Sequence, residues 1–147
     1  MSFNVVVDKN TKIKLYNMKK GIYKKYLTYI NEILFDDNII CFIGKIIKMH
    51  MSLFIQECEL TKLLDEDIDV DKAYSYFYIF NIYEEFCGIN HLGIVNYISN
   101  IFIRSQIPIL YINTFNENII FVSEKDLDDA IICIGSFIDN DKIKVIK

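Results

Sequence analysis

Polar side chains are concentrated in one short segment between two apolar runs. Residues 113–118 read Asn-Thr-Phe-Asn-Glu-Asn, and five of these six residues are polar. A polar turn supported by a rigid sheet places amide, hydroxyl and carboxylate groups where they can hold a small molecule. The segment contains no activated nucleophile and no cluster of metal ligands. The segment therefore predicts non-covalent binding and not catalysis.

Nucleophilic chemistry has little support elsewhere in the chain. A thiol enzyme needs a base beside its cysteine, and only two histidines, His50 and His91, are available to Cys58 or Cys87. Glycine-rich phosphate loops and CxxC pairs are absent. We therefore predict a protein that is not an enzyme and has no cofactor and no metal site. Reduced, mostly buried thiols in a cytoplasmic protein are expected of the four irregularly spaced cysteines, which are Cys41, Cys58, Cys87 and Cys133.

The acidic segment 65–71, Asp-Glu-Asp-Ile-Asp-Val-Asp, has two interpretations. Its alternating oxygen ligands suit a calcium loop, but it lacks the turn glycine and the distal glutamate of an EF-hand. A solvated connection between two halves of the chain is the favoured interpretation.

Charge and hydropathy exclude two classes of partner. The net charge is −4 and the pI is about 5.1, whereas nucleic-acid-binding domains are usually basic. No apolar run approaches the roughly 20 residues that span a bilayer. We expect neither nucleic acid nor membrane as a partner. A solvated helix face explains the lysine group Lys19, Lys20, Lys24 and Lys25.

Hydrophobic periodicity predicts two similar halves. In the first half, strands are expected at 3–7, 12–16, 38–48 and 52–56, with helices at 21–36 and 57–64. In the second half, strands are expected at 74–82, 107–113, 118–122 and 142–146, with helices at 93–105 and from 127 onward. Ser123 and Asp126 have the spacing of a capping box before the last helix. Packing in a core or an interface is expected of the strand face formed by Tyr74, Tyr76 and Tyr78.

Each half reads as strand, helix, strand, strand, helix and strand. This order is typical of a split βαβ, ferredoxin-like βαββαβ fold. The sequence therefore predicts an α+β protein of two tandem domains, 1–70 and 71–147, with antiparallel sheets and helices on one face of each.

Three runs in the second half resemble one family. They are Gly93-Ile94-Val95, residues 107–115 (Ile-Pro-Ile-Leu-Tyr-Ile-Asn-Thr-Phe) and residues 121–127 (Phe-Val-Ser-Glu-Lys-Asp-Leu). Together they are similar to the ACT-domain signature of the cytosolic arginine sensors (CASTOR-like proteins) and their small bacterial relatives. The resemblance extends more weakly over 22–35, 42–48 and 52–60. It implies two tandem ACT-like domains, where the animal sensors have two such pairs.

In that family the amino-acid ligand lies between ACT domains. It is held by the loop before a helix, the start of the next strand and the turn after that strand. Backbone N–H groups at a helix start can hold the ligand carboxylate, and carboxylate or amide side chains can hold its ammonium group. The resemblance implies the ligand-binding residues Asn90, His91, Leu92, Gly93, Ile94, Val95, Pro108, Ile109, Asn113, Thr114, Phe115, Glu117 and Asn118.

Three of these positions depart from the family pattern. The arginine sensor has carboxylates where His91 and Asn118 stand, and a serine where Pro108 stands. The loss of negative charge weakens recognition of a cationic side chain, although Glu117 can restore one carboxylate. We therefore expect an amino acid or similar small metabolite other than arginine as the ligand. Roles without a ligand are also open for two of these residues: His91 as a polar surface residue, and Thr114 as a residue that satisfies the backbone of the turn.

Two hypotheses of function remain. The first is a regulatory amino-acid sensor that acts through ligand-dependent protein–protein interaction. The second is a ligand-free ACT-fold interaction or oligomerisation module that has lost the amino-acid pocket. A homodimer is expected in either case, because ACT sheets have edges that the family covers by pairing domains. A regulatory protein is a further expected partner.

Overall fold

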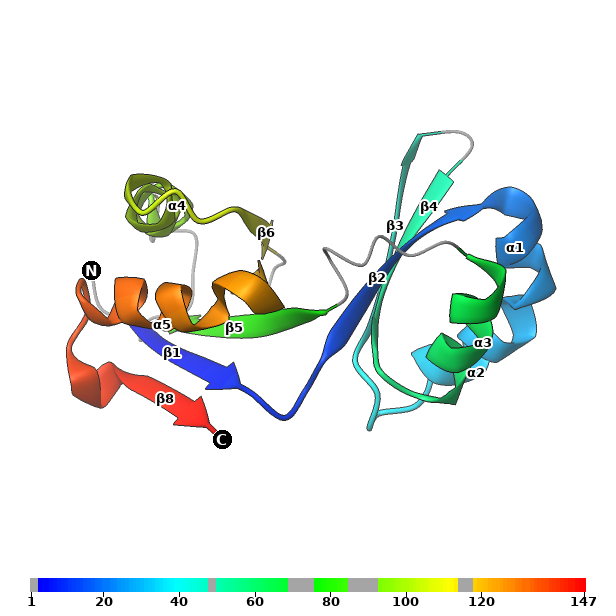
Figure 1. Cartoon of the computed structure of the whole chain (residues 1–147), viewed down its shortest axis with the longest axis horizontal. Helices are drawn as coiled ribbons and strands as arrows, with labels where there is room; N and C mark the ends of the chain where they lie inside the picture. The colour runs from blue at the N-terminus through cyan, green and yellow to red at the C-terminus, as the bar shows by residue number, and fades with distance from the viewer. Residues whose placement is uncertain (1–2, 48–49, 69–75, 85–92, 114–117) are drawn as a thin grey trace. The chain divides into compact units, whose positions relative to one another are not determined.

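The computed structural model describes residues 3–47, 50–68, 76–84, 93–113 and 118–147, and its elements are labelled in Figure 1. Two compact units share the chain. The terminal unit contains residues 1–10 together with 78–147, and the inserted unit contains residues 11–77. The division expected from the sequence, 1–70 and 71–147, stays a prediction. The compact units differ from that division by grouping the first strand with the C-terminal half.

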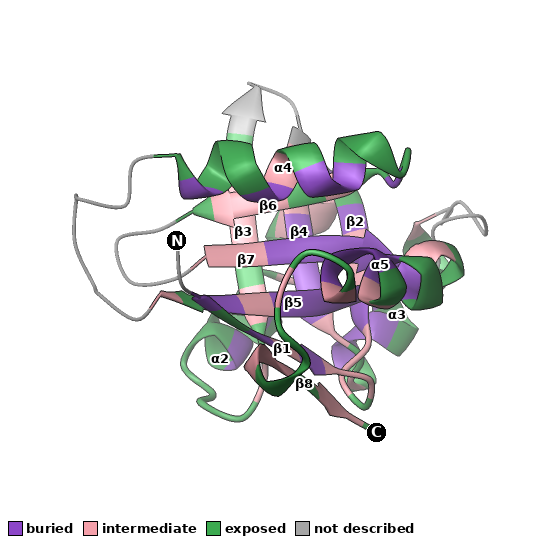
Figure 2. Cartoon of the chain, turned by 90° about the vertical axis from the view of Figure 1, so that its left-hand side faces the viewer, coloured by how far each residue is buried: buried purple, intermediate pink, exposed green. Residues whose placement is uncertain are grey.

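The terminal unit is a sheet with two helices on one face. Its strands lie in the order β8–β1–β5–β7–β6. Figure 2 shows that the buried residues of α4 lie on the side of the helix toward the strands. In chain order the elements are β1 (Phe3–Asp8), β5 (Phe77–Glu84), α4 (Ile94–Arg104), β6 (Ile109–Asn113), β7 (Asn118–Ser123), a 3₁₀ turn (Glu124–Asp126), α5 (Leu127–Gly135), a second 3₁₀ turn (Asn140–Lys142) and β8 (Ile143–Ile146).

Strand β1 lies between β5 and β8. It pairs antiparallel with β5, where Val5 is opposite Ile82, and parallel with β8, where Val5 is opposite Ile143. Alternation explains its place, because Phe3, Val5 and Val7 are at most 1 % exposed while Asn4 is exposed. The expected α+β fold is confirmed, with one parallel pair added to the antiparallel ones.

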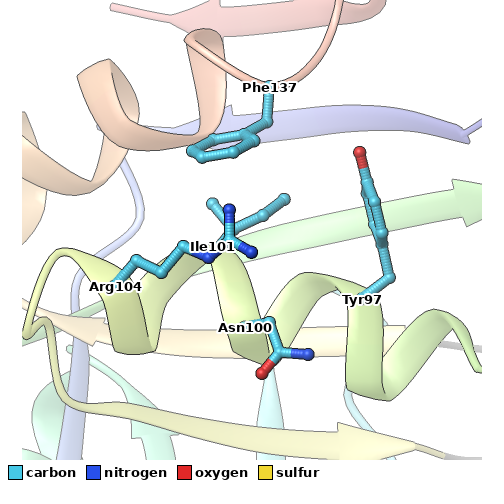
Figure 3. A pocket seen from close by; sticks show the side chains of 5 residues that line it. All are labelled: Tyr97, Asn100, Ile101, Arg104 and Phe137. Carbon is cyan, nitrogen blue, oxygen red and sulfur yellow. The ribbon is translucent and has the colours of Figure 1, made fainter.

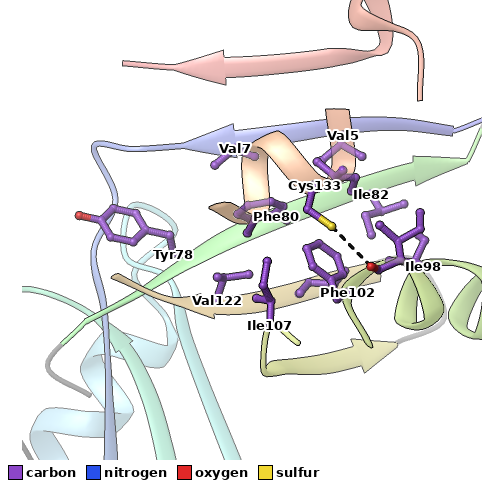
Figure 4. Close-up of a cluster of buried hydrophobic side chains, with 14 of the residues drawn as sticks. Val5, Val7, Tyr78, Phe80, Ile82, Ile98, Phe102, Ile107, Val122 and Cys133 are labelled. Atoms are coloured by element: carbon purple, nitrogen blue, oxygen red, sulfur yellow. Dashed lines mark hydrogen bonds between the residues drawn. The ribbon is translucent and has the colours of Figure 1, made fainter. Parts of the chain in front are cut away.

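The core of the terminal unit joins both helices to one face of the sheet. Phe80 on β5 and Phe102 on α4 meet edge to face, with ring centroids 6.2 Å apart. Cys133 on α5 donates its S–H to the carbonyl of Ile101 at 3.4 Å (Figure 4). These contacts bury the apolar stripe of α4, which consists of Ile94, Ile98, Ile101 and Phe102.

The inserted unit repeats this design. Its strands β3 (Cys41–Ile47), β4 (His50–Gln56) and β2 (Ile13–Lys19) lie in the order β3–β4–β2, and Phe77 pairs with Ile13 beyond β2. Its helices are α1 (Lys20–Lys25), α2 (Leu27–Leu34) and α3 (Glu59–Asp67). Their core residues are Tyr16, Met18, Ile30, Ile33, Leu53, Ile55, Leu60 and Leu64.

The helix expected at 21–36 is divided at Tyr26. The backbone of Tyr26 has φ −105° and ψ 11°, which separates α1 from α2. The N–H of Tyr26 nevertheless donates to Ile22 and that of Ile30 donates to Tyr26, at 3.2 and 2.9 Å. These are helical i to i−4 bonds, so the two segments form one bent helix.

The acidic segment is only partly a connection, which corrects the expectation for residues 65–71. Asp65 and Asp67 belong to the last turn of α3. The Asp65 carboxylate accepts from the Tyr16 hydroxyl at 2.7 Å and pairs with Lys14. The Asp67 carboxylate accepts from the Lys25 ammonium at 2.7 Å and from the Tyr26 hydroxyl. Lysines balance acids at a helix end where the macrodipole disfavours negative charge. Residues 69–71 lie outside the described residues.

The two helix starts differ from the pattern in the sequence. Before α5 the Ser123 hydroxyl donates to the Asp126 carboxylate at 2.9 Å, and no side chain caps the backbone there. The expected capping box is therefore absent at this start, because Asp126 lies within a 3₁₀ turn and bonds to Ser123 itself. A capping box is instead present at α3, where Cys58 and Thr61 bond reciprocally.

Candidate functional site

Asn118 joins the end of the β6–β7 hairpin to strand β5. Its side-chain oxygen accepts from the amide of Asn113 at 2.6 Å and from the hydroxyl of Tyr111 at 3.3 Å. Its amide nitrogen donates to the carboxylate of Glu84 at 3.2 Å. Asn113 and Asn118 are also direct partners in the strand register. The structure therefore brings together two of the predicted ligand-binding residues and adds Glu84 and Tyr111 to them.

Tyr111 lies at the buried edge of this group. Burial, and after it the negative charge of Glu84, raises the pKa of Tyr111 to about 12. The phenol therefore stays protonated near neutral pH and acts as a hydrogen-bond donor. Tyr111 is two residues before Asn113, so both side chains stand on one face of β6, and period-two alternation is the signal that could have identified Tyr111.

Chain topology places these residues at one end of the terminal unit's sheet. Strand β5 ends at Glu84, β6 ends at Asn113 and β7 begins at Asn118, and hydrogen bonds connect these three residues. Pro108, by contrast, precedes the first residue of β6. Five residues of extended chain separate Pro108 from Asn113, which is about 17 Å. The predicted site residues therefore divide between the two ends of β6.

The start of α4 has open backbone donors. Gly93 adopts φ 98°, a left-handed conformation that favours glycine, and its carbonyl accepts the first helical bond from Tyr97 at 2.8 Å. No side chain caps the N–H groups of this turn. Such groups can hold an anion. Gly93 and Val95 are exposed, whereas the side chain of Ile94 is 3 % exposed and belongs to the core.

The remaining predicted residues are of two kinds. Pro108 is exposed, and Ile109 is half-buried against the core of the terminal unit. The others, Asn90, His91, Leu92, Thr114, Phe115 and Glu117, lie outside the described residues. Glu84 was missed because it follows an aromatic strand whose sequence pattern indicates packing.

The cysteines of the described chain are buried or half-buried. Cys41 and Cys58 both pack against the core of the inserted unit, and burial raises the pKa of the Cys41 thiol to about 11. A thiol in that state is a poor nucleophile at neutral pH. Among the described residues, no group of three His, Cys, Asp or Glu side chains could hold a metal ion. No helix in this part of the chain is long and apolar enough to cross a membrane.

Comparison with solved structures gives the fold. A protein from Agobacterium tumefaciens is similar with a TM-score of 0.64 and 14 % identity, over 99 % of this chain and 93 % of that one. A Vibrio cholerae protein of unknown function, described as a possible transport protein, has a TM-score of 0.62 and 12 % identity over 92 % and 90 % of the two chains.

A third solved structure is a regulatory domain. It is described as a C-terminal regulatory domain of aspartate kinase from Porphyromonas gingivalis. The TM-score is 0.57 and the identity 17 %, over 95 % of this chain and 99 % of that one. At these identities the three structures support the ferredoxin-like ACT fold and no more. None of the curated proteins matches the sequence.

The family comparison locates the ACT domain. The sequence profile described as ACT domain matches residues 80–135, which run from β5 through α4, β6 and β7 to α5. The match contains the hairpin end and the start of α4. ACT domains are regulatory and not catalytic, bind small molecules such as amino acids, and often form oligomers. Residues 80–135 of this protein are therefore similar in sequence to an ACT domain.

Proposed function

We propose that this protein is a regulatory amino-acid sensor whose ligand binds at the end of the terminal unit's sheet, beside Asn118. The single observation that carries the proposal is the Glu84–Asn118 contact of 3.2 Å inside the ACT domain. The family of arginine sensors has a carboxylate where Asn118 stands. Glu84 places a carboxylate next to that position from another strand, and a carboxylate attracts an ammonium group.

The other half of an amino acid also has a candidate partner. The uncapped first turn of α4 offers backbone N–H groups and the positive end of a helix dipole. Gly93 has no side chain to obstruct that turn. A ligand carboxylate at α4 and a ligand ammonium at Glu84 would together satisfy both charged groups of an α-amino acid. The residues of the β6–β7 hairpin end would then select the side chain of the amino-acid ligand.

Sensing requires that the ligand bind two states with different affinity. We place this difference in protein association, because large apolar side chains remain exposed on the helices of the ACT domain. Ile103 on α4 is 67 % exposed and Ile132 on α5 is 68 % exposed. A second copy of the chain is the proposed partner, and a ligand-dependent regulatory protein is a further one. Light scattering after size-exclusion chromatography tests the dimer, and a mass of one chain at high concentration argues against it.

The test of ligand binding is thermal unfolding in the presence of each amino acid. A ligand that binds only the folded state at a hundred times its Kd adds about 2.7 kcal/mol of stability. We expect one amino acid to raise the Tm of the wild type, and Glu84→Gln to abolish the rise. Asn140→Asp is a remote control for altered charge, since Asn140 is exposed in the 3₁₀ turn before β8. If no amino acid raises the Tm at millimolar concentration, sensing is wrong.

A gain-of-function variant makes the test sharper. Asn118→Asp restores the carboxylate of the family pattern and removes the donor to Glu84, so two carboxylates face each other. This variant should be less stable without ligand and should gain affinity for arginine or lysine. Asn140→Asp adds the same charge far from the hairpin and should gain none. An Asn118→Asp variant that behaves like Asn140→Asp in the presence of arginine would contradict the placement of the site.

One observation favours the alternative, a ligand-free interaction module. The side-chain oxygen of Asn118 already accepts two internal hydrogen bonds, and its amide donates a third. A group satisfied in this way stabilises the hairpin without any ligand. Under this alternative the protein is a dimer, no amino acid raises its Tm, and Glu84→Gln alters stability only.

A further inference from the structure

A small pocket lies in the terminal unit, between α4 and the segment that follows α5. Its volume is about 120 Å³, and its five lining residues are labelled in Figure 3: Tyr97, Asn100, Ile101, Arg104 and Phe137. Tyr97, Ile101 and Arg104 are spaced by four and three residues, so they share one face of α4. None of these residues belongs to the hairpin end, and the N–H of Tyr97 is already bonded to Gly93, so it is not one of the open donors at the start of α4.

Apolar groups form the floor and one wall of this α4 pocket. Ile101 is 3 % exposed, and Figure 3 shows it between the side chains of Arg104, Phe137 and Tyr97. The ring of Tyr97 forms the opposite wall. An edge-to-face contact with the buried ring of Phe3 holds Tyr97, with ring centroids 6.0 Å apart. The lining therefore combines one core residue, Ile101, with four exposed residues, of which Tyr97 is held by a core ring.

The chain has 16 lysine and arginine residues in total, and Arg104 is the only arginine among them. A guanidinium presents a planar fork that matches a carboxylate, whereas a lysine presents a point charge. Within the described part of the chain, no hydrogen bond or ion pair engages Arg104 or the hydroxyl of Tyr97. Arg104 also lies in the last turn of α4, where a positive charge favours the helix dipole, but a lysine would serve that purpose equally.

We propose that the α4 pocket binds the carboxylate of a small aliphatic acid. The carboxylate would accept two hydrogen bonds from Arg104 and a third from Tyr97, and the short hydrocarbon would lie between Ile101 and Phe137. A cavity of about 150 Å³ can hold benzene, so a volume of about 120 Å³ restricts the enclosed part of the ligand to a few heavy atoms. This pocket is independent of the amino-acid site proposed above.

The lining distinguishes a simple acid from an amino acid. None of the five lining residues carries a carboxylate. The amide nitrogen of Asn100 donates one of its two N–H groups to Asn96 at 3.3 Å, so its oxygen is the only side-chain acceptor of the pair that remains for an ammonium group. An α-ammonium group placed here would exchange water for a poor set of partners beside a guanidinium of like charge. The pocket should therefore prefer 3-methylbutanoate over valine, which differs from it by the ammonium group.

The sole arginine makes the test direct. In the ¹⁵N-labelled protein, Arg104 provides the one arginine Nε–Hε correlation of the chain. We expect 3-methylbutanoate, titrated at constant ionic strength, to shift this signal and the amide signals of Tyr97 and Phe137 in a saturable manner. The uncharged 3-methylbutanamide, chloride and valine should shift it less at equal concentration. An equal response to chloride or to the amide, or a linear drift without saturation, overturns the proposal.

A conservative variant separates binding from structure. Arg104→Lys keeps the positive charge at the end of α4 but loses the fork, and a lost hydrogen bond to a charged group weakens affinity about tenfold or more. The amide signals of Tyr97 and Phe137 report binding in this variant. Tyr97→Phe should weaken binding by a smaller factor. Unchanged affinity in Arg104→Lys, or tighter binding of valine than of 3-methylbutanoate, shows that the pocket is not a carboxylate site.

Discussion

Helices α3 and α4 both bury apolar residues in the cores of their units, but they differ in their polar contacts. In the inserted unit, α3 contributes two aspartates that bond to tyrosine and lysine side chains outside the helix. In the terminal unit, α4 buries an apolar stripe, and in the described part of the chain none of its side chains makes a polar contact with a strand. Polar groups on α3 therefore serve stability. Those on α4 remain available to a ligand.

The comparison predicts where stability is most sensitive to a single change. Phe102→Ala removes a ring that is fully buried against Phe80, and such truncations cost about 3–5 kcal/mol. Ile103→Ala is the matched control on the next residue, which is 67 % exposed, and should change stability by about 0.5 kcal/mol or less. Urea unfolding followed by circular dichroism measures both. Similar losses from the two variants would show that α4 is not held by its apolar stripe.

A smaller effect is expected from the polar attachment of α3. The hydroxyl of Tyr16 is buried and bonds to Asp65 at 2.7 Å and to the carbonyl of Thr61 at 3.2 Å. Tyr16→Phe leaves both acceptors without that donor, at a cost of about 1–3 kcal/mol in unfolding free energy. Tyr29→Phe is the matched control, because Tyr29 is 38 % exposed. Equal unfolding free energies of the two variants in urea would show that the hydrogen bonds of the Tyr16 hydroxyl to α3 do not stabilise the protein.

Each unit contains a buried tyrosine whose ionisation should lower stability at alkaline pH. Burial and a neighbouring carboxylate raise the pKa of Tyr16 and of Tyr111, the latter to about 12. Because the folded-state pKa exceeds the unfolded value of about 10, each contribution is complete below pH 10 and declines as pH rises above 10, and that of Tyr111 is lost as pH passes about 12. The loss is at most about 1.4 kcal/mol per pH unit for each tyrosine.

Tyr111→Phe is the variant for this measurement. Its urea midpoint should fall less steeply between pH 10 and 11 than that of the wild type, and Tyr16→Phe should behave in the same way. Wild type and Tyr111→Phe with parallel pH profiles would mean that Tyr111 ionises normally in the folded protein.

The same contrast explains what the sequence could predict. Periodicity located the elements well, since Ile94, Ile98, Ile101 and Phe102 form the expected stripe of α4. Pairing between distant strands leaves no such pattern. Nothing in the residues of β1 indicates that Val5 lies beside Ile143 and not beside β2.

The contacts between side chains could not be predicted from the sequence either. The contact of Asn118 with Glu84 depends on the proximity of β5 and β7, and that of Asp65 with Tyr16 depends on how α3 crosses its sheet. Sequence spacing therefore identifies a polar turn or an acidic run, but not the residue that each one faces. Arg104 is an exception, because its rarity is visible in the sequence alone.

The smallest effect on stability is expected from the exposed ion pair of Lys25 and Asp67. Lys25→Met removes this solvent-exposed ion pair, which contributes little to stability and is screened by salt. The hydrogen bond to Lys25, and after it the one to Tyr26, lowers the pKa of Asp67. The contribution of Asp67 is thus present above pH 4 and is lost as pH falls, when the carboxylate gains a proton. We expect a small decrease in the urea midpoint at pH 7 and low salt, none in 1 M salt, and a smaller decrease as the pH falls below 4. Lys24→Met is the control, an adjacent exposed lysine that should have no such pH or salt dependence. A decrease that persists in 1 M salt would assign the stabilisation to packing of the Lys25 methylene chain on the ring of Tyr26, over which its ammonium lies at 5.3 Å.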